Sequence, residues 1–561
     1  VIAAGGPALL FTNVTDASFP LVTNLFGTSR RAELAFGTRP LQLIKRLVGL
    51  AETLLPPTAS KLWEARDVAG SLLRMGTVPK TRGAVTDVVT SDVNLDRLPA
   101  LTCWPDDGGA FITLPLVYTE HPDRPGHNLG MYRMQVHDCR STGMHWQIGK
   151  GGGFHYAAAE AGGQALPATV FLGGPPALML AAIAPLPENV PELMLASLVA
   201  GQRLPVVDNV GPHRLIGTAE FALMGSVAPD VRRSEGPFGD HYGYYSLAHD
   251  YPVFSVEQIA HRKDAIYPAT VVGKPRQEDF FIGDLLQELL SPLFPLVMPA
   301  VVDLWSYGET GYHSLGAAVV RQRYEREAMA SAFRILGEGQ LSLTKFLLVT
   351  DQPVDLRNFR ETLVHLLQRT HPETDLYVFS NLSMDTLDYT GPEVNKGSKG
   401  VWLGLGPAVR QLPQEFRSSE LPHGVSTVGV FCPGCLVVDA PAYAEEPNVG
   451  ARIAKAEVFK DWPLIVISDE PERAASSVIN FLWTTFTRFE PAADIYASRT
   501  EMVRHHVSYS SPVVIDARMK SSYPDELSCR PDIARKVTDR WTEYFSGSVV
   551  EMGDSEKASL T

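Results

Sequence analysis

The sequence predicts a multidomain protein of mixed α+β and α/β class, with a β-rich region between two regions in which helices and strands alternate. Three observations support this prediction. The chain has 561 residues, 45% of them hydrophobic and 20% charged, which is too long for a single hydrophobic core. Short strand-like runs joined by Gly and Pro turns fill the middle of the chain. Before and after them, apolar runs with helical spacing alternate with strand-like runs.

The first domain is predicted at residues 1–105, as an N-terminal α/β domain. Helical spacing of apolar residues extends over 41–55 and again over 59–75. A stretch rich in Pro and Gly around Pro79 then interrupts the helical pattern, as turn residues do.

The second domain is predicted at residues 106–305 and is mainly β. Strand-like runs at 111–118, 129–136 and 144–148 are joined by turns that contain Gly and Pro. Short strands connected in this way are typical of an antiparallel sheet or barrel. The apolar stretch at 175–184 is predicted to be an inserted helix.

The third domain, a C-terminal α/β domain, is predicted at residues 306–500. Its strands and helices alternate as in a sheet covered by helices: strand-like runs at 346–350, 376–379 and 462–468 alternate with helical runs at 356–369 and 474–486. Residues 501–561 are predicted to form a C-terminal extension that follows the surface from about Ile515. No internal repeat is visible in the sequence.

Composition excludes several classes of protein. The net charge of −14 argues against nucleic-acid binding, which requires surplus Lys and Arg. The most apolar stretch, Ala165–Leu186, is interrupted by Gly and Pro, unlike a membrane span, and no signal peptide is visible after Val1. We therefore expect a soluble cytoplasmic protein. The five cysteines form no disulfide framework, and Cys432-Pro-Gly-Cys435 is predicted to be a buried turn rather than a redox pair.

Two segments of the β-rich region contain groups that could bind an anion. Arg133 ends Asn128-Leu-Gly-Met-Tyr-Arg133 on a predicted strand, where it either faces a carboxylate or ligand anion or lies on the surface of an edge strand. Gly149-Lys-Gly-Gly-Gly-Phe154 is a glycine-rich loop that contains Lys150. Such a loop could approach a phosphate, or it could be a flexible hairpin loop without such a role.

The segment Glu235-Gly-Pro-Phe-Gly-Asp-His-Tyr-Gly243 is the most informative one. It places two carboxylates and a histidine on a turn with aromatic neighbours. Carboxylates so close shift each other's pKa, and one can then stay ionised while the other carries a proton, as general acid–base catalysis requires. A charged surface turn is the alternative. Lys399, between Gly397 and Gly400, is by default a solvated loop lysine.

Taken together, these segments resemble the UbiD family of prenylated-FMN-dependent decarboxylases and carboxylases. The resemblance rests on N-L-G-M-Y-R, M-x-W, E-G-P-F-G-D-H-Y-G, G-K-P-x-x-E-D and G-S-K-G, in this order between about Gly5 and about Gly404. The family's namesake is the 3-polyprenyl-4-hydroxybenzoate decarboxylase of ubiquinone biosynthesis. The resemblance implies an N-terminal α/β domain, a central split β-barrel that binds prenylated FMN, and a C-terminal α/β domain used in oligomerisation.

The resemblance also assigns functional residues. It implies that Arg133, Glu235 and Asp240 are catalytic, with Asp240 as the proton donor. It places cofactor contacts at Met131, Tyr132, Arg133, His145, Trp146, Gln147, Lys150, Gly151 and Lys399, and a further cofactor- or ion-binding stretch, where K⁺ is one candidate, at Gly217 and Thr218.

A divalent metal, usually Mn²⁺ in this family, would bind Asn128 and Glu192. The family's histidine ligand is replaced by Gly149. His145, His155 or water would therefore have to complete the metal site, or the ion would bind weakly.

The activity implied by the resemblance is reversible, non-oxidative decarboxylation of an aromatic or α,β-unsaturated carboxylic acid, such as a 4-hydroxybenzoate-type acid. The alternatives are an aryl carboxylase that runs in the CO₂-fixing direction and a non-catalytic UbiD-like assembly subunit. The implied partners are a flavin prenyltransferase that supplies the cofactor and further copies of the chain, in a homo-oligomer from dimer to hexamer.

Overall fold

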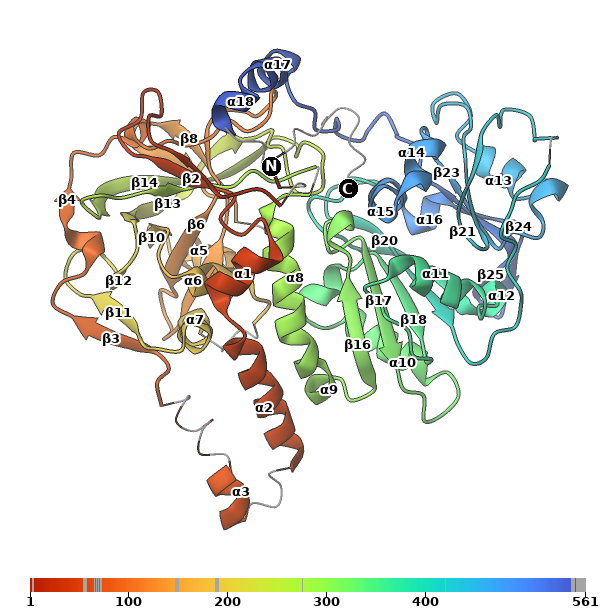
Figure 1. Ribbon diagram of the computed structural model, residues 1–561, viewed down its shortest axis with the longest axis horizontal. Coiled ribbons are helices and arrows are strands. Elements are labelled where there is room, and N and C mark those ends of the chain that lie inside the picture. The colour runs from red at the N-terminus through yellow and green to blue at the C-terminus, as the bar shows by residue number, and fades with distance from the viewer. Residues whose placement is uncertain are drawn as a thin grey trace. The chain divides into compact units, whose positions relative to one another are not determined.

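The computed structural model contains two compact units (Figure 1). The first holds residues 1–289 and the segment that begins at Glu526, and the second holds residues 290–525. The structure describes residues 1–2, 5–53, 58–64, 66, 68, 70, 73–146, 151–186, 191–274, 276–418, 420–545 and 550.

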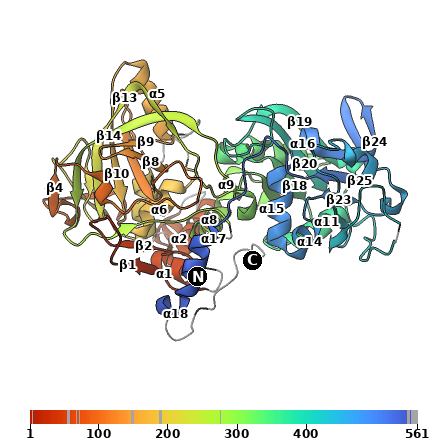
Figure 2. The same cartoon turned by 90° about the horizontal axis from the view of Figure 1, so that it is seen from above.

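A nine-stranded antiparallel sheet forms the centre of the first unit (Figure 2). Its strand order is β5-β8-β9-β14-β13-β10-β6-β7, and β4 pairs with β14. The strands are β4 (Val88–Thr90), β5 (Phe111–Ile112), β6 (Pro115–Glu120), β7 (His127–Met131), β8 (Met134–Asp138), β9 (Ser141–Gly143), β10 (Leu166–Leu172), β13 (Phe221–Glu235) and β14 (His249–His261).

The sheet is curled into a half-barrel. Strand β7 lies at one end of the strand order and β8 lies next to the other end, yet only Tyr132 and Arg133 separate them in the chain. A link of this length spans about 10 Å at most, so the two ends of the sheet must approach each other. Tyr132 and Arg133 therefore lie at the split of the barrel.

The concave packing of the sheet creates the core of the first unit. Val117, Met134, Leu223 and Phe254 belong to one cluster of buried side chains and are fully or almost fully inaccessible to solvent. They come from β6, β8, β13 and β14, so this core holds together strands from both sides of the split.

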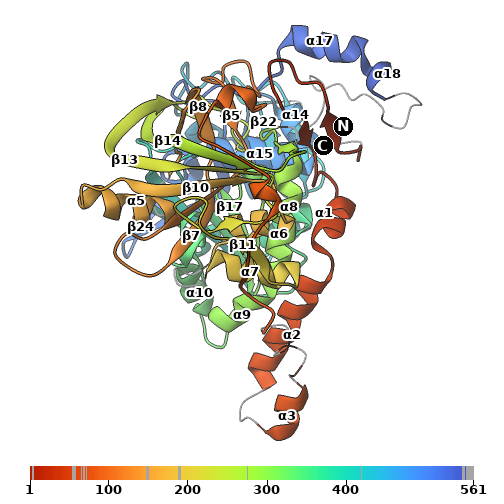
Figure 3. The same ribbon diagram turned by 90° about the vertical axis from the view of Figure 1, so that its left-hand side faces the viewer.

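Smaller elements surround the half-barrel. The sheets are β1 (Leu9–Phe11), β2 (Leu21–Thr23) and β15 (Tyr267–Pro268), and β12 (Leu215–Ile216), β11 (Leu204–Val207) and β3 (Thr77–Lys80). The helices are α1 (Ser29–Phe36), α2 (Arg39–Thr53), α3 (Ala59–Glu64), α5 (Gly151–Ala161), α6 (Pro176–Ile183), α7 (Glu192–Ala200), α17 (Pro531–Asp539) and α18 (Trp541–Tyr544). Helices α2 and α3 project away from the sheet (Figure 3).

The second unit contains two five-stranded sheets, each with parallel and antiparallel pairs. The first has the order β16-β17-β18-β20-β19 and the second β21-β22-β23-β25-β24. The first sheet consists of β16 (Val301–Ser306), β17 (Leu315–Val320), β18 (Phe346–Thr350), β19 (Leu376–Ser383) and β20 (Lys396–Gly404). The second consists of β21 (Val428–Cys432), β22 (Cys435–Val438), β23 (Leu464–Ile467), β24 (Ile495–Val503) and β25 (His506–Asp516).

Helices connect the strands of each sheet. After β18 come α11 (Phe359–Leu367) and α12 (Pro372–Asp375), and after β23 come α14 (Pro471–Ser476), α15 (Val478–Arg488) and α16 (Pro491–Asp494). The two sheets therefore share both their strand order and their connections. The sequence-based expectation that no internal repeat exists is wrong for the second unit, because the repetition is structural and little of it is visible as identical residues.

Several expected elements are confirmed and others differ. The helix near 175–184, the strand at 346–350 and the buried turn at Cys432 and Cys435 are present. Residues 144–146 form no strand, since the chain leaves the sheet after β9. Gly151–Gly153 form the first turn of α5 rather than a loop, because the Ala-rich segment that follows favours a helix. The extension does not begin on the surface, because Asp516 and Arg518 are fully buried.

One helical stretch in the described part of the chain, Glu278–Val297, has the length and mean hydropathy, 1.4, of a candidate membrane span. It is not one continuous α-helix, because α8 (Glu278–Leu290) is followed by a 3₁₀ turn, Ser291–Leu293, and by α9 (Phe294–Val297). Glu278 is buried and accepts hydrogen bonds from the backbone N–H groups of Asn24 and Phe26. We therefore interpret the stretch as part of a globular protein. The cytoplasmic location stays a prediction.

Candidate active site

Arg133 lies at the split of the half-barrel and binds two carboxylates. Its Nε lies 3.2 Å from Glu235 Oε1, its Nη1 donates to Asp240 Oδ2, and its Nη2 donates to Ser246 Oγ at 2.9 Å. Its guanidinium also stacks over the Phe238 ring, 4.7 Å from the ring centroid. The residue belongs to the link between β7 and β8, not to a strand. Of the two interpretations of Arg133, the structure supports the one in which it faces a carboxylate.

Glu235 is the last residue of β13 and is 1% exposed. Its Oε1 lies 2.8 Å from His145 Nδ1, in addition to its contact with Arg133. Its Oε2 is buried and has no hydrogen-bond partner among the described residues. A Cβ atom on Gly143 would come within 2.6 Å of this oxygen, so glycine at that position leaves the oxygen room to meet a ligand.

Asp240 lies on the loop that follows β13. Its Oδ1 accepts a hydrogen bond from the backbone N–H of His241 at 2.7 Å and lies 2.6 Å from His241 Nδ1. Side chains from other parts of the chain hold this loop: Gln135 accepts the N–H of Gly236 at 2.8 Å, and Asp107 accepts the N–H of Gly239 at 2.7 Å. The turn expected from the sequence is therefore present, and these hydrogen bonds hold it in place.

The three charged side chains fix each other's protonation states. Burial alone would raise the pKa of Glu235, but His145 and Arg133 outweigh it, and the net shift is downward. Burial likewise opposes the charge of Asp240, but Arg133 and His241 hold its pKa well below its usual range. Burial would lower the pKa of Arg133, and the two carboxylates raise it. All three groups are therefore ionised at neutral pH.

The start of α5 packs closely against β7, and together they form a candidate phosphate cradle. A Cβ atom on Gly151 would lie 2.2 Å from Asn128 Oδ1, and one on Gly152 would lie 2.5 Å from Trp146 Nε1. The hydroxyl of Tyr132 accepts hydrogen bonds from Asn128 Nδ2 at 3.3 Å and from the N–H of Gly152 at 3.4 Å. Helix N-termini with close backbone approach suit phosphate groups.

Trp146 gives a further sign that a polar group belongs here. Its Nε1 is buried and has no hydrogen-bond partner in the described part of the chain, although a buried indole N–H normally finds one. Together with the close approach of α5, this orphaned donor fits a bound cofactor that carries acceptor atoms. Met131 ends β7 beside the same site.

Glu192, His127 and Asn128 gather at the edge of the half-barrel. Glu192 begins α7, and its Oε2 lies 3.9 Å from His127 Nε2; both atoms are buried and lack hydrogen-bond partners among the described residues. Burial lowers the pKa of His127 and raises that of Glu192. No group of three or more His, Cys, Asp or Glu side chains suited to a metal occurs in the part of the chain that the structure describes. An ion here would need the Asn128 amide, a phosphate or water as well, and the orphaned oxygen and nitrogen fit that requirement.

The other expected site residues have different surroundings. Gly217 and Thr218 follow β12, where the Gly217 N–H donates to Pro205 O at 2.8 Å and Thr218 is exposed. Lys399 belongs to β20 of the second unit and donates to Thr344 O at 2.9 Å. Burial lowers the pKa of Lys399 to about 8, so it is not a solvated loop lysine. Three residues with an expected place in the site lie outside the described residues: Gln147, Gly149 and Lys150.

The roles of several residues of the site were not inferred from the sequence. Ser246, His241 and Asp107 hold Arg133, Asp240 and the loop in place, and His145, expected only as a cofactor contact, binds Glu235. His241 was noted in the motif without an assigned role, and Ser246 lies close to the motif and could have been found there. Asp107 could not, because only the fold brings it to the loop.

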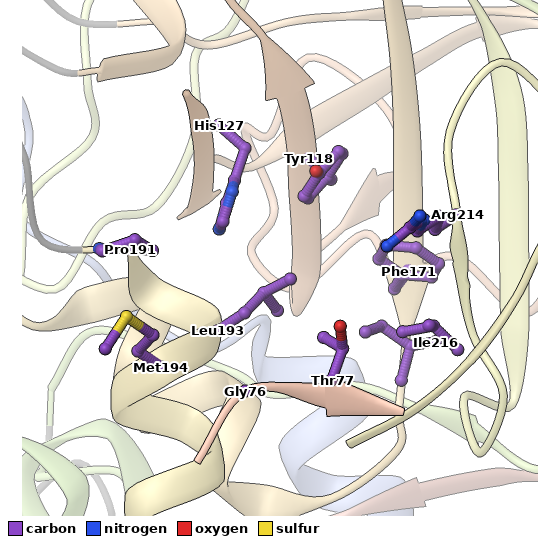
Figure 4. Close-up of a pocket in the computed structure, with 11 residues that line it drawn as sticks. Gly76, Thr77, Tyr118, His127, Phe171, Pro191, Leu193, Met194, Arg214 and Ile216 are labelled. Carbon is purple, nitrogen blue, oxygen red and sulfur yellow. The ribbon is translucent and has the colours of Figure 1, made fainter. Parts of the chain in front are cut away.

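A separate cavity of about 250 Å³ is lined by residues of β6 and β7, among others (Figure 4). Arg133, Glu235 and Asp240 do not line it. Tyr118, His127 and Arg214 contribute its polar groups, and the remaining wall is mainly apolar: Gly76, Thr77, Phe171, Pro191, Leu193, Met194, Val206 and Ile216.

Comparison with known protein families decides the affiliation of the chain. Three models of the 3-octaprenyl-4-hydroxybenzoate carboxy-lyase match it: the N-terminal domain at residues 1–51, the Rift-related domain at 77–275 and the C-terminal domain at 280–404. The chain belongs to the UbiD family. The resemblance found in the motifs is thereby confirmed, and so is the enzyme class, because UbiD-family enzymes are carboxy-lyases.

This UbiD-family protein has relatives over nearly its whole length. It is 51% identical over 546 residues to a 4-hydroxybenzoate decarboxylase subunit of Chlamydia pneumoniae, and the match covers 97% of this chain and 92% of the relative. It is 38% identical over 430 residues to an uncharacterized protein of Archaeoglobus fulgidus, a match that covers 76% of this chain and 87% of the relative.

Solved structures show the same fold. Vanillic acid decarboxylase of Sedimentibacter hydroxybenzoicus, in its closed form, matches with a TM-score of 0.62 and 24% identity over 74% of this chain and 87% of that one. The UbiD-class enzyme HmfF of Pelotomaculum thermopropionicum, in complex with FMN, matches with a TM-score of 0.59 and 21% identity over 74% and 89%. The mixed α/β multidomain fold expected for the chain is thereby confirmed at this coarser level.

Proposed function

We propose that this UbiD-family protein removes CO₂ from an aromatic or α,β-unsaturated carboxylic acid, with prenylated FMN bound at the split of its half-barrel. The observation that carries the proposal is the buried arrangement of Arg133 between Glu235 and Asp240. Burying three charges carries a large desolvation cost. Their presence here therefore points to a purpose beyond stability. A guanidinium that is already ion-paired and partly desolvated is well suited to bind a substrate carboxylate.

Residues of the chain carry out most of the proposed reaction. Arg133 binds the substrate carboxylate and thereby releases part of its hold on Asp240. The pKa of Asp240 then rises, and His241 in its imidazolium form, whose Nδ1 lies 2.6 Å from Asp240 Oδ1, can pass it a proton and recover one from solvent. When the bond between the substrate carbon and CO₂ breaks, Asp240 donates this proton to the carbon, and the decarboxylated product and CO₂ leave. Glu235 stays ionised beside Arg133 and His145.

Prenylated FMN, when bound, supplies an electrophilic centre that accepts the electron pair left behind by CO₂. Residues proposed to hold it are Met131, Tyr132, Trp146 and Gly151 near the catalytic trio, with Gln147 and Lys150 on the same segment of the chain. Gly217, Thr218 and Lys399 stay in the proposal on the resemblance alone. HmfF, which has the same fold, has been solved with FMN and, in an evolved dimeric form, with prenylated FMN.

Asn128 and Glu192 are proposed to bind a divalent cation, Mn²⁺ by the family resemblance, beside the cofactor phosphate. The substrate is proposed to be a 4-hydroxybenzoate-type acid, which is supported by the name of the Chlamydia pneumoniae relative. A flavin prenyltransferase as cofactor supplier, a K⁺ ion and assembly into a homo-oligomer complete the proposal.

The decisive experiment is coexpression with a flavin prenyltransferase, followed by an absorption spectrum and an assay with 4-hydroxybenzoate, vanillate and cinnamate. We expect a bound flavin with a spectrum distinct from FMN, and CO₂ release from at least one acid. Protein that binds the flavin but converts none of the acids, with and without added bicarbonate, would favour a non-catalytic assembly subunit. Net carboxylation of the corresponding phenol at high bicarbonate would instead identify the carboxylase direction.

A further inference from the structure

His127 and Glu192 form an incomplete pair at the edge of the half-barrel. Their Nε2 and Oε2 atoms are 3.9 Å apart, which is too far for a hydrogen bond. Neither buried atom has another hydrogen-bond partner among the described residues. Leaving buried polar atoms unsatisfied is energetically costly. The distance between the two atoms therefore leaves space for an ion that both of them can bind.

The surroundings of His127 suit a cation. Its ring stacks on Tyr118 with centroids 5.2 Å apart, which fixes the direction of Nε2. Glu120, opposite His127 in the pairing of β6 with β7, is already engaged by the Tyr118 hydroxyl at 2.9 Å. Because β7 is the edge strand, Glu192 can lie along its edge, within reach of groups on both faces of the strand. The cavity beside His127 offers room for water ligands (Figure 4).

We propose that His127 supplies the nitrogen ligand of a divalent cation that it shares with Glu192, in place of the histidine that the family has at position 149. Two metal–ligand bonds of about 2.1 Å each can span the gap between the two atoms. Each of the two histidines considered from the sequence already has one ring nitrogen in contact with another side chain. His145 Nδ1 binds Glu235 at 2.8 Å, and His155 Nδ1 lies 2.9 Å from the Thr119 hydroxyl. The cation's role beside the flavin rests on the proposed function, but its binding does not.

The test uses the full-length protein and Mn²⁺ alone. Electron paramagnetic resonance of bound Mn²⁺ should show nitrogen modulation from a coordinated imidazole. His127→Gln should abolish this modulation and weaken Mn²⁺ binding at least about tenfold, whereas His155→Gln, a matched control, should leave both unchanged. Glu192→Gln should weaken binding with the imidazole intact, which keeps the test valid if His127→Gln folds poorly.

Two results would overturn the proposal. Nitrogen modulation that persists in His127→Gln and disappears in His155→Gln would assign the ligand to His155. Absence of Mn²⁺ binding by the wild type would leave His127 and Glu192 as a simple polar pair. Neither result depends on decarboxylation, so both are distinct from failure of the proposed function.

The repeated architecture of the second unit carries a separate inference. Both sheets show the same succession of antiparallel, parallel, parallel and antiparallel pairs. Each contains a short helix with Pro at its start and Asp at its end, followed by Leu-Tyr or Ile-Tyr. In both, this Asp accepts the N–H of the residue before the Pro: Asp375 that of His371 at 2.8 Å and Asp494 that of Glu490 at 2.6 Å.

The two copies pack against each other reciprocally. Helix α12 of the first copy packs against β25 of the second, and the equivalent helix α16 packs against β20, the equivalent of β25 (Figure 1). Their apolar faces share one hydrophobic cluster, in which Phe359 meets Phe431 and Phe481. Reciprocal contacts between equivalent surfaces are the property of a twofold-symmetric homodimer interface.

We infer that the second copy, residues 428–516, acts as a built-in partner for the first, so that a homodimer-like interface is closed within one chain. The matched family domains end at residue 404, before this second copy begins. The surface of the first copy that a second chain would otherwise cover is therefore already occupied. Any oligomer of this protein has to use other faces.

Cross-linking across the interface tests this inference. The rings of Tyr377 and His506 lie 4.8 Å apart, one in each copy. In full-length protein with the exposed Cys139 and Cys529 changed to Ser, the pair Tyr377→Cys and His506→Cys should cross-link on oxidation or with a short bis-maleimide. We expect an internally linked monomer by intact mass, and no linkage in either single-cysteine variant. A covalent dimer, or no cross-link at all, would overturn the inference.

Discussion

Replacing Asp240 by Asn removes the proposed proton donor while changing the volume of the side chain very little. In the variant, the side-chain oxygen of the new Asn can still accept a hydrogen bond from the backbone N–H of His241. The Nδ2 of this Asn takes the place of Asp240 Oδ2, which in the wild type accepts from the Arg133 guanidinium. Arg133 keeps Glu235 and Ser246 as partners. The site should therefore stay assembled, and the effect should be confined to proton transfer and local charge.

Two magnitudes follow from these contacts. A positioned general acid contributes about 10²–10⁴ in rate, so turnover of Asp240→Asn should fall by that factor, equivalent to about 3–5 kcal/mol in the barrier. Loss of one hydrogen bond between charged groups costs about 1.5–3 kcal/mol of stability. Because the folded pKa of Asp240 is lowered, its stabilising contribution is present at neutral pH and is lost as pH falls below about 4. The stability difference from wild type should shrink accordingly in acid.

The assay separates bond breaking from protonation. Flavin content, product formation and exchange of labelled CO₂ into the substrate carboxylate are measured in the same preparation. We expect full flavin content, strongly reduced product and retained exchange. Asp138→Asn is the matched control, because Asp138 is about half-exposed and pairs only on the surface with Arg233; its activity should match wild type. Wild-type turnover in Asp240→Asn would refute the donor role and make Glu235 the next candidate.

Three further predictions follow from the same site. Arg133→Ala should leave two buried carboxylates uncompensated, costing about 3–5 kcal/mol of stability in chemical denaturation, and should lower kcat; a change in KM alone would contradict the role. Gly151→Ala should reduce flavin content because its Cβ would clash with Asn128, whereas Gly49→Ala, with nothing within 4 Å, should keep the flavin and melt slightly higher. Burial raises the pKa of Asp279 to about 7, so the contribution of this group to stability should fall as pH rises from about 4 to about 7. Asp279→Asn should therefore have a higher melting temperature than wild type at pH 8 but not at pH 5. Equal melting temperatures at both pH values would contradict this.

Features of the candidate site and fold were predictable from the sequence where the residues that form them are close together in the chain. Glu235 and Asp240 belong to one short segment rich in Gly and aromatic residues, so their grouping in one candidate site was predictable before any fold was known. The strand at 346–350 and the helix near 175–184 were predictable because continuous apolar runs leave few alternatives. The residues around Arg133 left two interpretations of this side chain open. Only the family resemblance placed it in the expected site.

Other features depend on contacts between distant residues and were not predictable. Nothing near Asp107 indicates that its carboxylate holds the loop at Gly239. The pair of His127 and Glu192 depends on α7 lying along the edge of β7. The internal repeat was missed because the two copies share strand order and a short Pro and Asp signature rather than a run of identical residues.

The position of Asp240 depends on both ends of the chain's first unit. Leu527 donates its backbone N–H to Gly243 O at 3.0 Å and packs with Trp104 and Tyr245, and Glu526 pairs with Lys274. The segment expected to be a surface extension thus supports the loop that carries Asp240, the proposed proton donor. These contacts connect the loop of Asp240 to residues nearly 300 positions away in the chain. A local motif can therefore suggest the chemistry, but the ion pair with Arg133 that lowers the pKa of Asp240 forms only when distant parts of the chain fold together.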